Sequence, residues 1–336
     1  MLNLFKEKTK SRLGVEIFPE GITLALLKME NNHVSVKSLI HKPVENYRLI
    51  PETLKAALIE CKADSLNVAI SVPGNAAFVK RIVLPELPQD ELKEIAPQEA
   101  SKYLPLPIRE MNIDFEILEN TRRQDETGKK IDVVMCAISK AVLKEYLDPV
   151  FDAGLGVDMI DVSSFALIRA LSYEGLINEA EKTYISVLIG YENTDINIIQ
   201  GGMPVFSYNI QTGRKNIIEN IMNSVQKTRA EVINLLPELS LMVPGMEMNE
   251  DPELQQASSA AKNLYSNISS EVQKTIEFFN SGNSQYVDIE KIIVSGNGAC
   301  IQNIDKFMSN KLRIETIIFS PLYSTSIGLA LKGFEN

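Results

Sequence analysis

The chain has 336 residues, of which 45% are hydrophobic and 23% charged, as expected for two globular domains or one two-lobed domain. Its 34 basic and 44 acidic side chains leave a formal net charge of -10. That charge disfavours general nucleic-acid binding, because phosphate contacts drive such affinity. Three distant cysteines and two histidines match neither a disulfide framework nor a metal-binding spacing, so no metal site is expected.

The first part of the chain, residues 12–75, has the pattern of half an α/β unit. Three strands are predicted over residues 12–45, and a helix begins at Pro51, because proline suits the first turn of a helix. A buried strand from Leu66 to Val72 follows. Residues 1–11 form a basic and apolar tail, expected to be frayed or to make a weak peripheral contact with anionic lipid.

A compact insertion is predicted over residues 76–156. It begins with an alternating strand, Phe78 to Leu84, and continues with a helix that starts at Pro88 with acidic residues in its first turn. Pro97 is expected to kink or restart this helix, because proline removes a backbone donor. Two strands and an amphipathic helix ending at Gly154 complete the insertion.

Residues 157–181 return to the first lobe with a strand and a helix, and residues 182–336 form the second lobe. This lobe begins with three strands and ends its core with a strand over residues 289–294. Between them lies a mainly helical insertion at about 214–285, broken near Pro237. Strand-strand-strand-helix-strand therefore occurs twice, which predicts a duplicated fold.

Two strand-turn-strand segments, at residues 14–24 and 186–197, and a strand with glycines at 292–299 make the layout of an actin-like (ribonuclease H-like) nucleotide-binding fold. A phosphate-binding turn needs backbone N–H donors and glycine or hydroxyl side chains. The first turn offers Pro19, which has no N–H, and Glu20, which would repel a phosphate. The order of strands and turns thus indicates an ATPase superfamily, whereas the residues in the first turn indicate a binding module.

The remaining candidate nucleotide-binding residues lie in the second turn and in the glycine segment. They are Gly190, Asn193, Thr194, Gly296, Asn297 and Gly298. Leu188 stands where an acid would hold magnesium through water, so two structural hairpins without ligand are the preferred interpretation. Glycines after a strand often serve only close packing. P-loop, zinc-protease and nucleophile-elbow motifs are absent, so no catalytic residues are assigned and ATP hydrolysis is expected to be absent or very weak.

Several segments carry a likeness to a known family. Residues 84–92, 99–107, 112–115 and 328–333 resemble the PilM family of type IV pilus assembly, and more distantly FtsA. The most specific is Glu99-Ala100-Ser101-Lys102-Tyr103-Leu104-Pro105-Leu106-Pro107, which matches the family's E-A-x-x-Y-[IL]-P-[FL]-P.

The resemblance implies an actin-like fold with subdomains 1A, 1C, 2A and 2B, in which 1C is an SHS2-like insertion. It also implies a cytoplasmic scaffold at the inner membrane that binds the N-terminal peptide of a PilN-like membrane protein, contacts other platform and motor proteins, and could form homo-oligomers. Typical members bind ATP with magnesium; here no cofactor is predicted. The peptide groove is expected between 1A and 1C, with candidate residues Phe78, Lys80, Ile82, Tyr103, Leu104, Leu106 and Ile108.

The sequence is also compatible with three other interpretations. One is an ATP-binding switch that closes its lobes on nucleotide, and another is a component similar to GspL of type II secretion or to MshI of MSHA pili. A third is an FtsA-like filament protein. The segment from Ile233 to Pro237 resembles the peptide by which PilN docks; a helix end stopped by proline is the preferred interpretation, with a self-mimic as the alternative.

Overall fold

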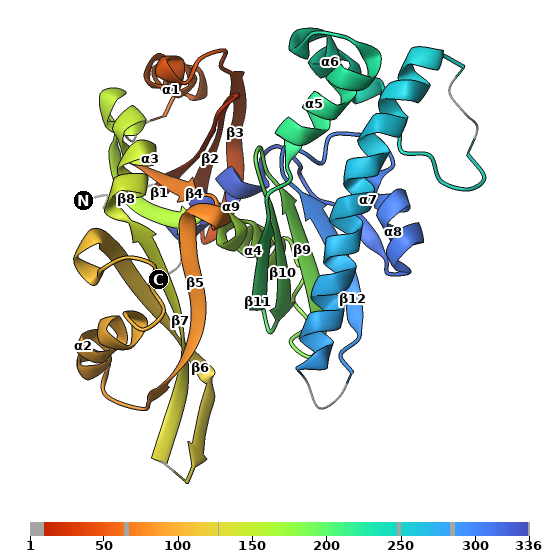
Figure 1. Ribbon diagram of the computed structural model, residues 1–336. Helices are drawn as coiled ribbons and strands as arrows, with labels where there is room; N and C mark the ends of the chain where they lie inside the picture. The colour runs from red at the N-terminus through yellow and green to blue at the C-terminus, as the bar shows by residue number, and fades with distance from the viewer. Residues whose placement is uncertain (1–9, 64–66, 127, 247–249, 283–285, 335–336) are drawn as a thin grey trace.

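The computed structural model describes residues 10–63, 67–126, 128–246, 250–282 and 286–334. Two lobes lie side by side, each built on a five-stranded sheet (Figure 1). Most of the predicted N-terminal tail and Leu66, at the start of a predicted strand, lie outside the described residues.

The first lobe has the strand order β3-β2-β1-β4-β8, with β1, β2 and β3 antiparallel and β4 and β8 parallel to β1. Helices α1 and α3 pack on one face, where Leu54 and Val150 share a core with Val15 and Leu24. The elements are β1 Lys10–Phe18, β2 Gly21–Glu30, β3 His33–Pro43, η1 Tyr47–Leu49, α1 Ile50–Cys61, β4 Asn67–Val72, η2 Gly74–Ala76, α3 Lys140–Asp152 and β8 Gly156–Val162.

The second lobe repeats this arrangement with the order β11-β10-β9-β12-β13. Every residue of β9 is buried, because the sheet is covered on both faces. The elements are β9 Thr183–Ile189, β10 Thr194–Gln200, β11 Met203–Ile210, α5 Arg214–Val225, α6 Arg229–Leu235, η4 Leu236–Glu238, α7 Pro252–Ser281, β12 Ile289–Ser295, α8 Ile304–Leu312 and β13 Thr316–Ile318. The predicted duplication is therefore confirmed.

Two helices, α4 (Ser163–Tyr173) and α9 (Ser324–Lys332), lie between the two sheets (Figure 1). Leu167 and Leu171 of α4 pack on the second sheet, while Ala166 and Ala170 pack against α9 and the first sheet. A helix that is apolar all round is suited to a position with protein on every side. This layer joins the lobes.

A separate three-stranded antiparallel sheet, of order β5-β7-β6, extends from the first lobe. Helix α2 covers one of its faces through Leu92 and Ala96. Its elements are β5 Ala77–Pro85, α2 Gln89–Ala100, η3 Ile108–Glu110, β6 Met111–Asp125 and β7 Gly128–Ser139. Pro97 lies inside α2, so the expected restart of the helix does not occur.

Candidate functional site

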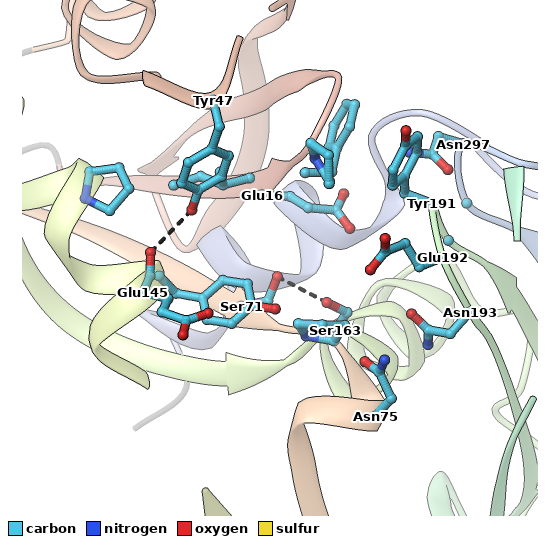
Figure 2. Close-up of a pocket in the computed structure, with 18 of the residues that line it drawn as sticks. Glu16, Tyr47, Ser71, Asn75, Glu145, Ser163, Tyr191, Glu192, Asn193 and Asn297 are labelled. Atoms are coloured by element: carbon cyan, nitrogen blue, oxygen red, sulfur yellow. Dashed lines mark hydrogen bonds between the residues drawn. The ribbon is translucent and has the colours of Figure 1, made fainter. Parts of the chain in front are cut away.

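A cavity of about 690 Å³ opens between the lobes, at the carboxyl ends of the central parallel strands (Figure 2). Both strand-turn-strand segments reach it, as do the glycine segment after β12 and the exposed side of α3. Its polar and aromatic lining includes Glu16, Tyr47, Arg48, Ser71, Asn75, Glu145, Tyr146, Asp148, Asp152, Ser163, Tyr191, Glu192, Asn193, Asp195 and Asn297.

The first turn, Phe18-Pro19-Glu20, is fixed by contacts within its own lobe. The Phe18 ring stacks on His41, with centroids 6.0 Å apart and planes 7° from parallel. The Val44 N–H donates to the Glu20 carbonyl at 2.7 Å. The Glu20 side chain points across to the second lobe, where it pairs with Arg214 and Arg229. The residues that depart from a phosphate-binding turn therefore have structural partners.

The second turn uses its hydrogen-bond donors internally. The Gly190 N–H donates to the Asn193 carbonyl at 2.8 Å, and the Thr194 hydroxyl donates to the Thr212 carbonyl at 2.7 Å. The Asn193 amide lies 3.5 Å from Asp195 and lines the cavity beside it. Groups that the sequence offered to a phosphate thus serve to close the turn.

The glycine segment after β12 is shaped by close packing on β9. Gly296 has a φ of +92°, and a Cβ there would lie 2.3 Å from the Ile189 carbonyl oxygen. Gly298 donates its N–H to that carbonyl at 2.9 Å, and its own carbonyl accepts from Tyr265. Asn297 lines the cavity and has a buried Oδ1 without a partner. The glycines are therefore needed for the fold itself.

The charge of the cavity is negative. Six acidic side chains line it, namely Glu16, Glu145, Asp148, Asp152, Glu192 and Asp195, and Arg48 is the one basic residue among its described lining residues. A polyanion such as a nucleotide would be repelled by these carboxylates. Within the described ranges, no three His, Cys, Asp or Glu side chains are placed to hold a metal ion.

Two of these carboxyls have strongly shifted pKa values. Burial raises the pKa of Glu16 from 4.5 to about 7, although hydrogen bonds from Thr325 and Thr23 act in the opposite direction. Burial likewise raises the pKa of Asp195 from 3.8 to about 6, against hydrogen bonds from Asn209 and the Gly74 N–H. Because Gly74 belongs to the first lobe and Asp195 to the second, the latter bond joins the two lobes.

A second cavity, of about 640 Å³, contains none of the residues expected from the sequence to line the peptide groove. It lies where the three-stranded sheet, α4, the end of α9 and the β10–β11 turn meet, and we call it the sheet–helix groove. Its polar side holds Asp161, whose carboxylate accepts from Arg169 at 2.8 Å and lies 3.7 Å from Lys332. The remaining lining residues include Met29, Val34, Glu116, Val134, Phe165, Tyr173, Met203, Pro204, Leu331 and Phe334.

A model of the family described as Type IV pilus assembly protein PilM matches residues 16–243. The chain belongs to the PilM family. This match confirms the family inferred from the sequence motifs.

Solved structures agree on the fold. A PilM–PilN type IV pilus biogenesis complex is 20% identical, with a TM-score of 0.80, and the match covers 97% of this chain and 99% of that chain. The ethanolamine utilization protein EutJ from Carboxydothermus hydrogenoformans is 15% identical with a TM-score of 0.58, covering 96% and 89%. MreB5 of Spiroplasma citri bound to AMPPNP is 13% identical with a TM-score of 0.54, covering 98% and 96%. The actin-like fold is therefore confirmed.

Four of the six residues expected to bind nucleotide line the interlobe cavity of this PilM-family member. Gly190, Asn193, Gly296 and Asn297 line the interlobe cavity. Thr194 and Gly298 do not line it; Thr194 is fully buried and Gly298 packs against Ile189.

The expected peptide-groove residues lie on the three-stranded sheet and the loop after α2. Lys80 sits 3.8 Å above the Tyr103 ring, and Leu106 and Ile108 are exposed. Phe78 and Leu104 are partly buried. Ile82, in contrast, is buried beneath α2 with Leu92, so its side chain is not available to a peptide at the surface.

The segment that resembles a docking peptide belongs to the second lobe's core. Helix α6 ends at Leu235, a 3-10 turn containing Pro237 follows, and Leu236 is 2% exposed. This agrees with the preferred interpretation of a helix end. No helix within the described residues is long and apolar enough to cross a membrane.

Proposed function

We propose that this chain is a cytoplasmic scaffold of the type IV pilus assembly platform that binds the short N-terminal peptide of a PilN-like membrane protein. The observation that carries the proposal is the sheet–helix groove. It is bounded by the three-stranded sheet, which we assign to subdomain 1C, and by α4 and α9, which we assign to 1A. The partner would bring the scaffold to the inner membrane, close to the other platform and motor proteins.

The chemistry of the groove suits an extended peptide. Phe165, Leu331 and Phe334 give apolar contacts, while the Asp161–Arg169–Lys332 group offers charges to polar peptide atoms. Strand β6, which lines the groove at Glu116, is an edge of its sheet, the position at which an added peptide strand pairs. The solved PilM–PilN complex, similar in fold, supports a partner of this kind.

Calorimetric titration with the PilN-like N-terminal peptide tests the proposal and locates the site. Phe334→Ala is expected to weaken binding about tenfold or more, as for a residue at the centre of an interface. Tyr103→Ala is the matched variant on the predicted surface around Lys80, and it is expected to leave affinity unchanged. The reverse result would move the site to that surface, and no binding by the unaltered protein would refute the proposal.

We also propose that nucleotide binding is weak or lost and that the chain does not hydrolyse ATP. The negative lining of the interlobe cavity and the internally bonded turns support this. Titration with ATP–magnesium is expected to give a dissociation constant above about 1 mM. Micromolar binding with turnover would instead favour the alternative, an ATP-driven switch that closes its lobes.

A further inference from the structure

Two arginines of the second lobe converge on one carboxylate of the first lobe. Arg214 Nε lies 3.1 Å from Glu20 Oε2, and Arg229 Nη2 donates to Glu20 Oε1. The side chains of Glu20 and Arg214 are each 17% exposed, so this contact is largely shielded from water. Shielding makes an ion pair stronger than one at an open surface.

The arginines are positioned by the second lobe itself. Arg214 Nη1 donates to the Asn297 carbonyl at 3.0 Å, and the Arg214 backbone N–H donates to the Gly190 carbonyl at 2.9 Å. Arg229 Nη2 donates to the Tyr191 hydroxyl at 2.9 Å. Both guanidinium groups would therefore stay close together without Glu20. Two adjacent positive charges favour an anion between them.

Glu20 is presented by a rigid turn. Its carbonyl accepts from Val44, and the neighbouring Phe18 ring is stacked on His41. A pocket of about 540 Å³ adjoins the ion pairs, lined by Glu20, Arg214 and Arg229 and also by Glu45 and His41. A small anion therefore has room to reach the arginines once the Glu20 carboxylate is gone.

We propose that Arg214 and Arg229 form an oxyanion site in the second lobe, and that Glu20 is its built-in ligand. The carboxylate takes the place of a free phosphate-type anion and ties the two lobes together. Phosphate, sulfate or pyrophosphate is excluded while Glu20 remains in place. The pocket beside these arginines shares no lining residue with the sheet–helix groove, so the anion site and the peptide site can be tested separately.

Titration with inorganic pyrophosphate tests the anion site. Glu20→Gln removes the charge that holds this side chain between the two arginines, so the neutral amide can turn aside, and the variant is expected to bind pyrophosphate at least about tenfold more tightly. Glu315→Gln is the control, because it removes an exposed acid that lines neither pocket, and its pyrophosphate binding should equal that of the unaltered protein. Adding Arg229→Gln to Glu20→Gln should abolish the gain. No gain in Glu20→Gln, or a gain that survives without Arg229, would overturn the proposal.

Urea unfolding of Glu20→Gln, Arg229→Gln and the double variant tests the tie between the lobes. Each substitution is expected to raise the unfolding equilibrium constant by some factor. For the double variant this factor should be at least about fivefold smaller than the product of the two single-variant factors, because both substitutions remove the same contact. If the single-variant factors simply multiply in the double variant, Glu20 and Arg229 do not stabilise the protein through a shared contact. Glu20→Asp is a second variant, in which the carboxylate is one methylene further from the arginines. Its pyrophosphate affinity and its stability in urea are both expected to fall between those of the unaltered protein and Glu20→Gln.

Discussion

The acids at the two turns occupy similar places in the chain but different surroundings. Glu20, in the first turn, is shielded between two arginines of the opposite lobe. Glu192, in the second turn, is exposed and lies 3.4 Å from Lys215 of its own lobe. One acid therefore connects the lobes, while the other is a local surface charge. Acids in corresponding turns of a duplicated fold therefore need not have the same role.

The largest effect is expected at Gly14, in the strand that leads to the first turn. A Cβ on Gly14 would lie 2.0 Å from the Ser326 carbonyl oxygen of α9. Because backbone must shift to relieve this overlap, Gly14→Ala is expected to destabilise the protein by about 4 kcal/mol in urea unfolding. Gly282→Ala, whose nearest atom would be 3.7 Å away, is the control and should change stability by less than about 0.5 kcal/mol.

The next effect concerns Glu16, at the base of the first turn. Its pKa rises from 4.5 in the unfolded chain to about 7 in the fold, so the folded state binds the proton more tightly. Stability is therefore lost as pH rises from about 4.5 to 7, by about 3 kcal/mol. Glu16→Gln should recover that amount at pH 8 and give no gain at pH 4. Equal effects at both pH values would contradict this assignment.

A smaller effect of the same sign is expected at Asp195, the second lobe's buried carboxyl. Its pKa rises from 3.8 to about 6, so stability is lost between those pH values. Asp195→Asn should recover about 2 kcal/mol of stability at pH 7, because it removes the buried charge. The gain is partly offset, since the amide has one acceptor fewer for Asn209 and Gly74. Unfolding curves across this range would show whether the pH dependence of the second lobe sits about one unit below that of the first.

The smallest effect is expected at Glu192. Because this acid and Lys215 are both more than 40% exposed, Glu192→Gln should change stability by less than about 0.5 kcal/mol. A loss as large as that of Glu20→Gln in the same urea series would remove the contrast between the two turns.

Much of the fold could be predicted because its signals are local. Apolar runs such as Ile185 to Ile189 predict buried strands, and the glycines after β12 mark a close approach to β9. The departure of Phe18, Pro19 and Glu20 from a phosphate-binding turn was also visible in the sequence.

The partners of those residues were not predictable, because they lie far away along the chain. Arg214 and Arg229 are separated from Glu20 by 194 and 209 positions. The sheet–helix groove combines β6, β7, α4, α9 and the β10–β11 turn, so no single segment reveals it. Ile82 was misplaced because strand alternation gives two faces without saying which one a helix covers.

Helix α9 contacts a lining residue of the interlobe cavity and itself lines the sheet–helix groove. Near its start, the Thr325 hydroxyl donates to Glu16 in the interlobe cavity, and at its end Leu331 and Lys332 line the sheet–helix groove. Nine helical residues make a rod of about 13 Å. The hydrogen-bond partner of Glu16 and two lining residues of the sheet–helix groove therefore belong to one helix of about two and a half turns, so a shift of this helix would change both places together.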